Sequence, residues 1–316
     1  MFRLYILDHD ALDTELVYSF SDLLQGFVRY KDEAEKRGIE IVYEKNVRSE
    51  EILRRGDKVD CFFTIIGGMI DYNGELYKNR LFKTATFLDD IHWWTKESLE
   101  NRLALFEKTD FVFTPYARTA NTYKEYEHLK EKFIPLHWWA PDVCFSYEQT
   151  WEKRIEKILL SGSISLYPIR RAISQNKHPI VDHLQHSLRH PNFIHPYHGV
   201  KFYEYLSKYK GAISASAEPH QPKDSIYLHQ LDYTLSKNFE VLGCGCLGFL
   251  EETVDFKDLG FKAYENFIPI TLDSYNQQWK YLFDNKAKNI VFNGREFVKK
   301  NHSTKNRIIQ ILEKIK

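Results

Sequence analysis

The sequence predicts an α/β protein of two domains, each built on a parallel, doubly wound sheet. Three observations lead to this prediction. The chain has 316 residues, enough for two domains of roughly 150 each. Hydrophobic residues make up 43% of it, which is ample for two cores and excludes global disorder. Short apolar runs alternate with charged, amphipathic segments, and strand–helix alternation with short connections is typical of parallel sheets.

Six apolar runs predict the strands of the first domain, residues 1–148. They lie at residues 2–7, 39–44, 60–68, 83–90, 110–114 and 133–136. The amphipathic segments between them predict helices at residues 23–38, 49–56, 95–110 and 117–132. Gly38 closes the first of these helices, and Thr95 supplies an N-cap to the third.

Three loops that follow these strands carry acids, histidines and tryptophans. They are Asp8-His9-Asp10, Asp89-Asp90-Ile91-His92-Trp93-Trp94 and His137-Trp138-Trp139-Ala140-Pro141-Asp142. The carboxyl ends of parallel strands meet at one edge of a sheet, where such sheets bind ligands. An acid beside a histidine could supply a general base, and a tryptophan could stack on a sugar ring. The alternative is that the acids and histidines cap helices and the tryptophans belong to the core.

Among these residues we rank Asp90 and His92 first as catalytic candidates, and His9 and Asp10 next. In each pair a carboxylate and an imidazole lie close in the chain at the end of a strand. A base at that position could take the proton of a substrate hydroxyl.

The second domain, residues 149–316, begins with a candidate phosphate site. Its first strand, residues 157–162, ends in a turn at Ser161, Gly162 and Ser163, and a helix that carries Arg170 follows. The N–H groups and the dipole of a helix N-terminus can hold phosphate, and arginine can bind it in bidentate fashion. Neither a GxGxxG motif nor a P-loop is present.

The remaining elements of this domain continue the alternation. A helix is expected to carry His183, His186 and His190 on one face, either as a metal site or, more simply, as an exposed face. Further helices are predicted at residues 201–210, 236–242, 274–285 and 294–316, and strands at residues 211–216, 246–251 and within 255–271.

Two acids mark the stretch from Asp232 to Glu251. Seven residues separate Asp232 from Glu240, and a glycine-rich end leads from the helix at 236–242 directly into a buried strand. That connection is typical of an α/β domain. Both acids would therefore lie at the end of a domain where a ligand can bind.

Charge and composition exclude several classes of protein. Lys and Arg number 44, as do Asp and Glu, and zero net charge argues against a nucleic-acid partner. No signal peptide and no integral membrane segment is expected. The four cysteines, few and irregularly spaced, are interpreted as buried, reduced thiols rather than metal ligands, which suits a cytoplasmic protein.

The C-terminal third resembles a known family. Three motifs carry the resemblance: FEVLGCGCLGFLEE, DLGF followed by ENFIPIT, and NGREFVKKNHSTKNRI. They resemble the nucleotide-sugar-binding domain of GT-B glycosyltransferases of the "glycosyl transferases group 1" (family-4-like) type, over residues 201–315 by motif and over the first half by architecture. The resemblance implies two Rossmann-like domains that face each other across a cleft, with the acceptor bound by residues 1–148 and the donor by 149–316. The last helix is expected to pack back on the first domain.

The resemblance also implies an activity. A hexosyl- or pentosyltransferase of this kind moves a sugar from a nucleoside-diphosphate sugar to a glycan or other hydroxyl acceptor in glycan biosynthesis. It needs no metal and no cofactor, because helix N-termini and arginine stabilise the leaving diphosphate.

Site residues follow from the matched motifs. Glu240 matches the acid that binds the nucleotide ribose, and Asp232 matches the earlier acid of an E-x7-E pattern, near the donor sugar or phosphates. Gly162 and Ser163 with Arg170 match the glycine turn and the diphosphate contact. Asp90 and His92 resemble residues that face the acceptor, and Asn266 lies where a loop approaches the donor.

Two alternatives remain open from the sequence. One is a sugar-nucleotide epimerase or hydrolase of the same two-domain architecture, which would be distinguished by its products. The other is a non-catalytic nucleotide-sugar-binding module, in which Asp232 and Glu240 are helix caps and surface charges.

Overall fold

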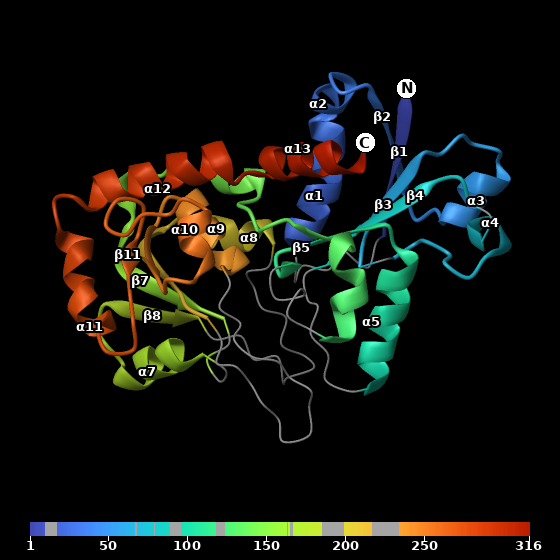
Figure 1. Cartoon of the computed structure of the whole chain (residues 1–316). Helices are drawn as coiled ribbons and strands as arrows, with labels where there is room; N and C mark the ends of the chain where they lie inside the picture. Colours follow the sequence, from blue (N-terminus) through green and yellow to red (C-terminus); the bar gives the residue numbers. More distant parts are fainter. Residues whose placement is uncertain are drawn as a thin grey trace. The chain divides into compact units, whose positions relative to one another are not determined.

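The computed structural model describes residues 1–9, 18–66, 68–78, 80–88, 96–117, 124–162, 164, 167–184, 199–216 and 234–316. These residues divide into two compact units. Unit 1 comprises the described residues within 1–137 and 304–316, and unit 2 comprises the described residues within 138–216 and 234–303. Each unit is built on one parallel sheet, as Figure 1 shows, so the predicted fold of two parallel-sheet α/β domains is confirmed.

Unit 1 contains a six-stranded parallel sheet in the order β2-β1-β3-β4-β5-β6. Its strands are β1 (Phe2–Asp8), β2 (Ile39–Lys45), β3 (Cys61–Ile65), β4 (Lys83–Phe87), β5 (Phe111–Thr114) and β6 (Phe133–Pro135). Its helices are α1 (Tyr18–Arg29), α2 (Lys31–Glu35), α3 (Ser49–Arg54), α4 (Glu75–Lys78), α5 (Lys96–Lys108), the 3-10 helix η2 (Lys124–Lys132) and α13 (Thr304–Ile315). The helix expected at residues 23–38 is thus two helices, with the break at Tyr30.

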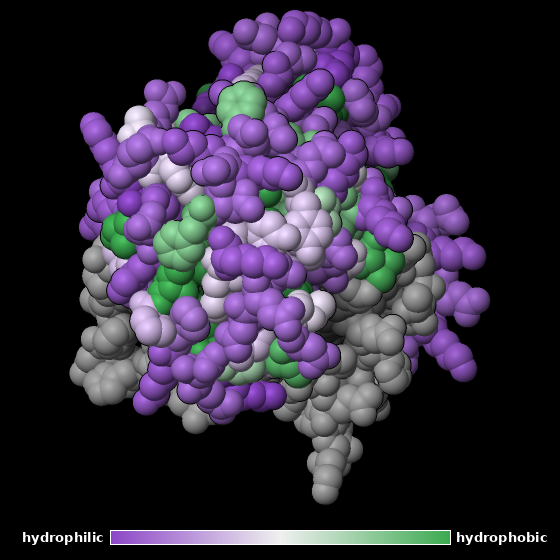
Figure 2. Space-filling model, turned by 90° about the vertical axis from the view of Figure 1, so that its left-hand side faces the viewer, coloured by the Kyte–Doolittle hydropathy of each residue, from purple (hydrophilic) through white to green (hydrophobic). Residues whose placement is uncertain are grey.

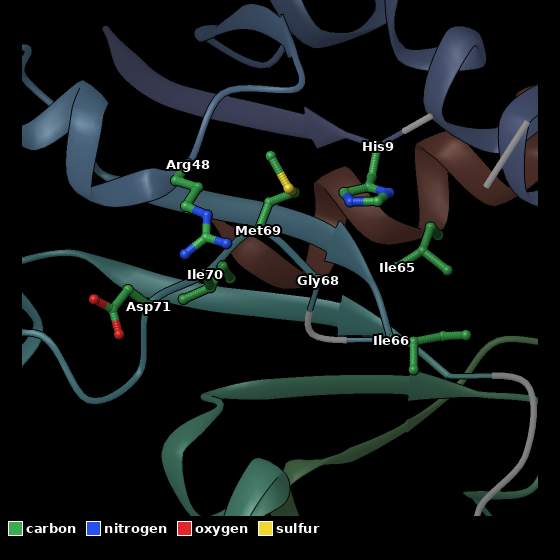
Figure 3. A pocket seen from close by; sticks show the side chains of 8 residues that line it. All are labelled: His9, Arg48, Ile65, Ile66, Gly68, Met69, Ile70 and Asp71. Atoms are coloured by element: carbon green, nitrogen blue, oxygen red, sulfur yellow. The ribbon is translucent and has the colours of Figure 1, made fainter. Parts of the chain in front are cut away.

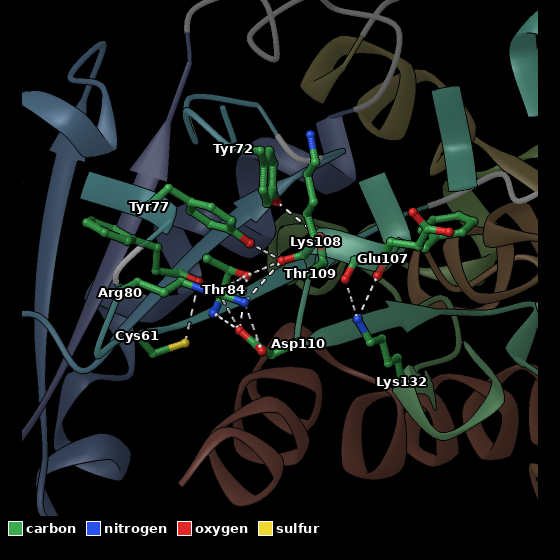
Figure 4. Close-up of polar contacts among 12 residues, drawn as sticks. Cys61, Tyr72, Tyr77, Arg80, Thr84, Glu107, Lys108, Thr109, Asp110 and Lys132 are labelled. Atoms are coloured by element: carbon green, nitrogen blue, oxygen red, sulfur yellow. Dashed lines mark hydrogen bonds and ion pairs between the residues drawn. The ribbon is translucent and has the colours of Figure 1, made fainter. Parts of the chain in front are cut away.

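A polar cluster holds the amino-terminal edge of this sheet together (Figure 4). The Arg80 guanidinium donates to both carboxylate oxygens of Asp110, at 2.7 and 3.1 Å, and lies 4.4 Å from the ring centroid of Tyr77. The same carboxylate accepts the backbone N–H of Thr84 at 2.7 Å. One bidentate ion pair therefore joins the starts of β4 and β5 to the loop before them.

The C-terminal helix α13 completes unit 1 by packing on α1 and α2. Its apolar face is fully buried and consists of Ile308, Ile311, Leu312 and Ile315. The hydroxyl of Thr304 donates to the Asp22 carboxylate of α1. On α2, hydrogen bonds from Lys305 and Lys36 lower the pKa of Glu33 to about 2. Burial and ion pairs together thus fix the last helix on the first.

Unit 2 contains a five-stranded parallel sheet in the order β11-β10-β9-β7-β8. Its strands are β7 (Ile155–Ser161), β8 (Val181–Leu184), β9 (Tyr209–Ser214), β10 (Leu247–Leu250) and β11 (Ile268–Pro269). Its helices are η3 (Asp142–Ser146), η4 (Trp151–Lys153), α7 (Pro168–Asn176), α8 (Val200–Leu206), α9 (Ser236–Gly243), α10 (Asp255–Asp258), α11 (Tyr275–Gln278), η5 (Trp279–Phe283) and α12 (Ala287–Asn301). Its core gathers Ile158, Leu160, Phe249 and Trp279 beneath α11 and α12.

Residues 138–148 pack with unit 2, ahead of the expected boundary at 148. The backbone N–H of Ala140 donates to the carbonyl of His302 at 2.9 Å. Gly243 of α9 packs directly against this segment. A Cβ at Gly243 would lie 2.9 Å from the Ala140 Cβ and 3.1 Å from the Cys144 Cβ. These contacts attach the segment after β6 to α9 and to the end of α12.

Three local predictions in the second half are wrong. His183 lies on the edge strand β8, which pairs with β7, so it is not on a helix face; His186 and His190 lie outside the described residues. The helix predicted to reach residue 210 ends at Leu206, because Tyr209 and Lys210 join the sheet as the start of β9. The closing helix is broken at residues 302–303 into α12 and α13.

Two further features concern the environment of the chain. All four cysteines are buried and free, as predicted. No helix in the described part of the chain combines the length and the hydrophobicity needed to cross a bilayer. Figure 2 shows one face of the molecule, on which the residues with assigned colours are mostly hydrophilic and the hydrophobic areas are small and separate.

Gly294 offers a test of how closely α12 packs. A Cβ at this position would collide with the backbone oxygen of Asn266. We expect Gly294→Ala to lower the free energy of unfolding by about 1–3 kcal/mol, although alanine is the better helix former. Asn293→Ala, at the exposed neighbouring position, should be neutral or slightly stabilising. Urea unfolding of both variants measures the difference, and a stabilised Gly294→Ala would contradict this packing.

Candidate functional site

The carboxyl edge of the second sheet brings three strand ends together. Leu250 at the end of β10 pairs with Ser214 at the end of β9, and β9 pairs in turn with β7, which ends at Ser161. Glu251 follows β10, and one of its carboxylate oxygens accepts the N–H of Ser216 at 2.6 Å. Polar groups from three strands thus lie at the edge where parallel sheets bind ligands.

Helix α9 supplies the central pair of charged residues at this edge. Lys237, in its first turn, donates from Nζ to the carbonyl oxygen and the Oγ of Ser161, at 3.0 and 3.1 Å. One turn later Glu240, only 8% exposed, accepts a hydrogen bond from the Tyr203 hydroxyl at 3.1 Å. The N-cap residue of α9 is Leu235, so within the described residues no N-cap side chain accepts a hydrogen bond from the first N–H groups of the helix.

Burial dominates the electrostatics of this cluster. Burial lowers the pKa of Lys237 to about 7, the positive charge of Arg170 acts in the same direction, and the Glu240 carboxylate opposes both. Burial also raises the pKa of Glu240, against the influence of Lys237 and the hydrogen bond from Tyr203. Among the described residues, the negative charge of Glu240 does not offset the effect of burial on the pKa of Lys237.

Arg170 contributes a second cation, and this one is buried. It lies in α7, is 4% exposed, and its guanidinium carbon is 3.9 Å from the ring centroid of Tyr167. Burial lowers its pKa, while the Glu251 carboxylate acts in the opposite direction. A buried arginine, a partly buried lysine and the start of a helix lie together here, an arrangement that would stabilise an anion.

The structure brings together three of the predicted donor-site residues, Gly162, Arg170 and Glu240. Gly162 links β7 to the segment before α7 with φ at +95°, a conformation that L side chains rarely adopt, and its N–H donates to the Leu184 carbonyl at 3.3 Å. Ser163 lies outside the described residues.

Asn266 is not part of this group. It precedes β11, which runs parallel to β10, so it lies toward the opposite, amino-terminal edge of the sheet. Its side chain is 4% exposed, and its Oδ1 accepts the N–H of Lys262 at 3.0 Å. In this structure its contacts hold the turn before β11.

The predicted acceptor-side residues are described only in part. His9 follows β1 and lines a cavity in unit 1 (Figure 3), while its N–H donates to the Asp8 carboxylate at 2.7 Å. The other candidates lie outside the described residues and stay predictions; they are Asp10, Asp90, His92 and Asp232.

The third of these loops, residues 137–142, has a different role from the one expected for its tryptophans. Trp138 is 7% exposed and Trp139 is fully buried, with their ring centroids 5.8 Å apart. Neither indole face is available to a sugar, so the sugar-stacking prediction is wrong for this loop. The core alternative holds, because both side chains are buried and the loop pairs through Ala140 with Ser303, just after α12.

Two residues of the site were missed from the sequence, Lys237 and Tyr203. Lys237 could have been predicted, because it lies three residues before Glu240 in the same helix and therefore on the same helix face. Tyr203 carries no local signal, because it reaches Glu240 from α8, 37 residues earlier in the chain.

Comparisons with known proteins bear on the fold. No protein-family model matches the chain. No curated protein matches it either. Solved structures do: an α-glucosyltransferase in complex with UDP-glucose and DNA containing an abasic site is similar at a TM-score of 0.61 and 10% identity, over 99% of both chains.

Two further solved structures are similar over the whole length. A glycosyltransferase from Rickettsia africae ESF-5 matches with a TM-score of 0.58 and 13% identity, over 99% of this chain and 98% of its own. Anabaena Alr3699/HepE in complex with UDP matches with a TM-score of 0.56 and 10% identity, over 99% of both chains. At these identities the likeness shows the fold: the chain has the two-domain GT-B architecture of these glycosyltransferase structures.

The prediction that excluded a nucleic-acid partner is wrong. Several of the similar solved structures are an α-glucosyltransferase bound to DNA, including 13-mer DNA with an HMU base or a central A:G mismatch. The physical reason is that net charge is a sum over the whole surface, whereas a nucleic acid contacts one face. Zero net charge therefore excludes no acceptor class for this fold.

The charge of Lys237 predicts a pH-dependent effect on stability. Its pKa is lower in the folded protein, so below pH 7 the lysine is charged in both states and its burial destabilises the fold in full. This cost declines as the pH rises from 7 towards the ordinary lysine value, because only the unfolded chain still binds the proton. Lys237→Met should therefore raise the melting temperature of the ligand-free protein more at pH 6 than at pH 9.

Thermal melting at both pH values measures this difference. Lys201→Met, which removes an exposed lysine from α8, is the matched control and should change neither value. A Lys237→Met variant that melts lower than the wild type at pH 6 would show that its bonds to Ser161 outweigh the cost of burying its charge.

Proposed function

We propose that this chain is a glycosyltransferase that moves a sugar from a nucleoside-diphosphate sugar to a hydroxyl acceptor without a metal ion. The observation that carries the proposal is the cluster of Lys237, Arg170 and Glu240 at the carboxyl edge of the second sheet. The fold supports it, since the similar structures include glycosyltransferases in complex with UDP or UDP-glucose.

The two cations would bind the diphosphate of the donor. Lys237 and Arg170 would bind its oxygens together with the uncapped N–H groups of α9, and charge-assisted hydrogen bonds of this kind are the strong ones. Negative charge accumulates on the leaving diphosphate as the glycosidic bond breaks. Cations already in position stabilise that charge without reorganisation, which is the role that a metal ion has in other enzymes.

Glu240 would bind the ribose of the nucleoside. A carboxylate accepts hydrogen bonds from two adjacent hydroxyls, as a ribose presents them, and Tyr203 already holds one of its oxygens in place. Approach of the diphosphate to Lys237 would raise the pKa of that lysine, and a charged Lys237 in turn favours the ionised form of Glu240. Diphosphate and ribose binding would therefore support each other.

The acceptor is activated, on this proposal, by residues of the first unit. His9 lies at the end of β1, and Asp90 and His92 are the predicted partners after β4. Asp232 is the predicted contact to the donor sugar. A hexosyl- or pentosyltransferase of the group 1 type with a glycan acceptor is the finer form of the proposal.

A thermal-shift screen tests the donor site. The proposal predicts stabilisation by one nucleoside diphosphate and its sugars, UDP first, of about 2.7 kcal/mol when the ligand is at 100 times its dissociation constant. Glu240→Gln should weaken UDP binding roughly tenfold or more, because an amide cannot replace the charge-assisted bonds. Glu204→Gln, in the neighbouring helix α8, is the control. No shift with any nucleotide would reject the proposal.

The pH dependence of binding is a second test. UDP-glucose carries a diphosphate with no proton to titrate near neutrality, so its charge stays constant. Affinity for it should fall between pH 6 and pH 8.5 as Lys237, with its pKa at about 7, loses its proton in the free protein. Calorimetry on wild type and Lys237→Arg should show this fall only in the wild type. A flat wild-type profile would exclude Lys237 from the diphosphate site.

A further inference from the structure

Unit 1 holds a cavity of about 520 Å³ at the carboxyl edge of its sheet. Its walls come from His9 after β1, Arg48 before α3, and the turn from Ile65 to Asp71 after β3, as Figure 3 shows. The volume is that of a small-molecule pocket. The described residues that line it all belong to unit 1, and none of them belongs to the Lys237 cluster.

The turn after β3 is held in a strained conformation. Ile66 has φ at +53° and Met69 at +66°, and a β-branched residue in this region is an outlier. Hydrogen bonds fix both: the Ile66 N–H donates to the Phe87 carbonyl, and the Ser49 N–H donates to the Met69 carbonyl, each at 2.9 Å. Strain of this kind persists where the surroundings impose it, and it concentrates at ligand sites.

The result is an apolar wall on an exposed edge. Ile66 is 44% exposed, although isoleucine usually lies in the core, and Met69 is only partly buried. Ile70 forms the base of the wall, at 8% exposure. Aliphatic side chains in this arrangement can pack against the C–H face of a sugar.

Arg48, which lies next to Met69 in Figure 3, supplies positive charge. Within the described part of the chain its guanidinium forms no salt bridge, whereas Arg54 pairs with Glu50 and Arg55 pairs with Glu44. The acid among the lining residues, Asp71, accepts the Asn73 N–H at 3.1 Å within its own turn. In Figure 3 its carboxylate points away from Arg48.

We propose that this cavity binds an acceptor sugar that carries an oxyanion, with the oxyanion on Arg48 and the sugar ring against Ile66 and Met69. The inference rests on the proposed transferase function, since it names the acceptor. Both carboxylate and phosphate match the fork of a guanidinium, so a uronic acid and a sugar phosphate share the required chemistry. The size of the cavity favours one or two sugar residues over a polymer backbone as the occupant.

Titration of the full-length protein, followed by NMR, tests the inference without any transfer reaction. The probes are glucuronic acid, glucose 6-phosphate and glucose. At least one of the two acidic sugars should bind roughly ten times more tightly than glucose, as one charge-assisted contact implies. Which of the two binds identifies the oxyanion. Equal binding of all three, or of none, would overturn the inference.

Three variants locate the bound sugar. Arg48→Met should weaken the acidic sugar roughly tenfold and leave the fold intact, because α3 is capped through the backbone N–H of Arg48 rather than its side chain. Arg54→Met, a neighbouring arginine outside the cavity, should leave binding unchanged. Lys237→Met should also leave it unchanged. Loss of binding in Lys237→Met but not in Arg48→Met would place the sugar in unit 2 and overturn the inference.

UDP-glucose titrated in parallel separates this inference from the proposed function. If UDP-glucose binds and the acidic sugars do not, the acceptor assignment fails and the transferase proposal stands. If the acidic sugars bind through Arg48 and neither UDP-glucose nor any other nucleoside-diphosphate sugar binds, the transferase proposal fails and the anion site stands. Binding of a 13-mer DNA duplex that depends on Arg48, without binding of either acidic sugar, would overturn the acceptor assignment.

Discussion

The placement of a partly buried Lys237 and a buried Arg170 beside Glu240 is the interaction on which the functional interpretation depends. Removing a cation from water is costly unless negative charge replaces the water, and here the pKa of Lys237 at about 7 shows that burial is only partly compensated. The parallel sheet imposes the arrangement, because β7, β9 and β10 end side by side and α9 starts there without a cap. A diphosphate would supply the missing negative charge.

Each unit needs parts of the chain that are distant in sequence. In unit 1, the surface of α1 around Gly26 is covered by the apolar face of α13. Helix α13 follows unit 2 in the sequence, so residues 1–137 alone would leave this surface exposed. The break at residues 302–303 is therefore a requirement of the fold. His302 stacks on Phe261 with ring centroids 5.5 Å apart, and its backbone carbonyl accepts the Ala140 N–H, so the end of α12 is fixed in unit 2 just before α13 starts.

The sequence predicted what local patterns control. Buried strands such as β3 and β10 were predicted from their apolar runs. The turn at Gly162 and the helix that carries Glu240 were predicted from residue type and spacing. What it could not supply depends on distant partners. Tyr203 reaches Glu240 from another helix, His183 lies on a strand because β7 pairs with it, and Trp138 and Trp139 are buried by the fold around them. The exclusion of nucleic acid failed because a total charge does not describe one face.

The most direct test of the central claim is a crystal structure of the protein with UDP bound. The account predicts that the diphosphate lies at the carboxyl edge of the second sheet, within hydrogen-bond distance of Lys237 Nζ, the Arg170 guanidinium and the first N–H groups of α9. The ribose hydroxyls should lie against Glu240, still held by Tyr203. UDP bound elsewhere, or a diphosphate without contact to either cation, would contradict the account.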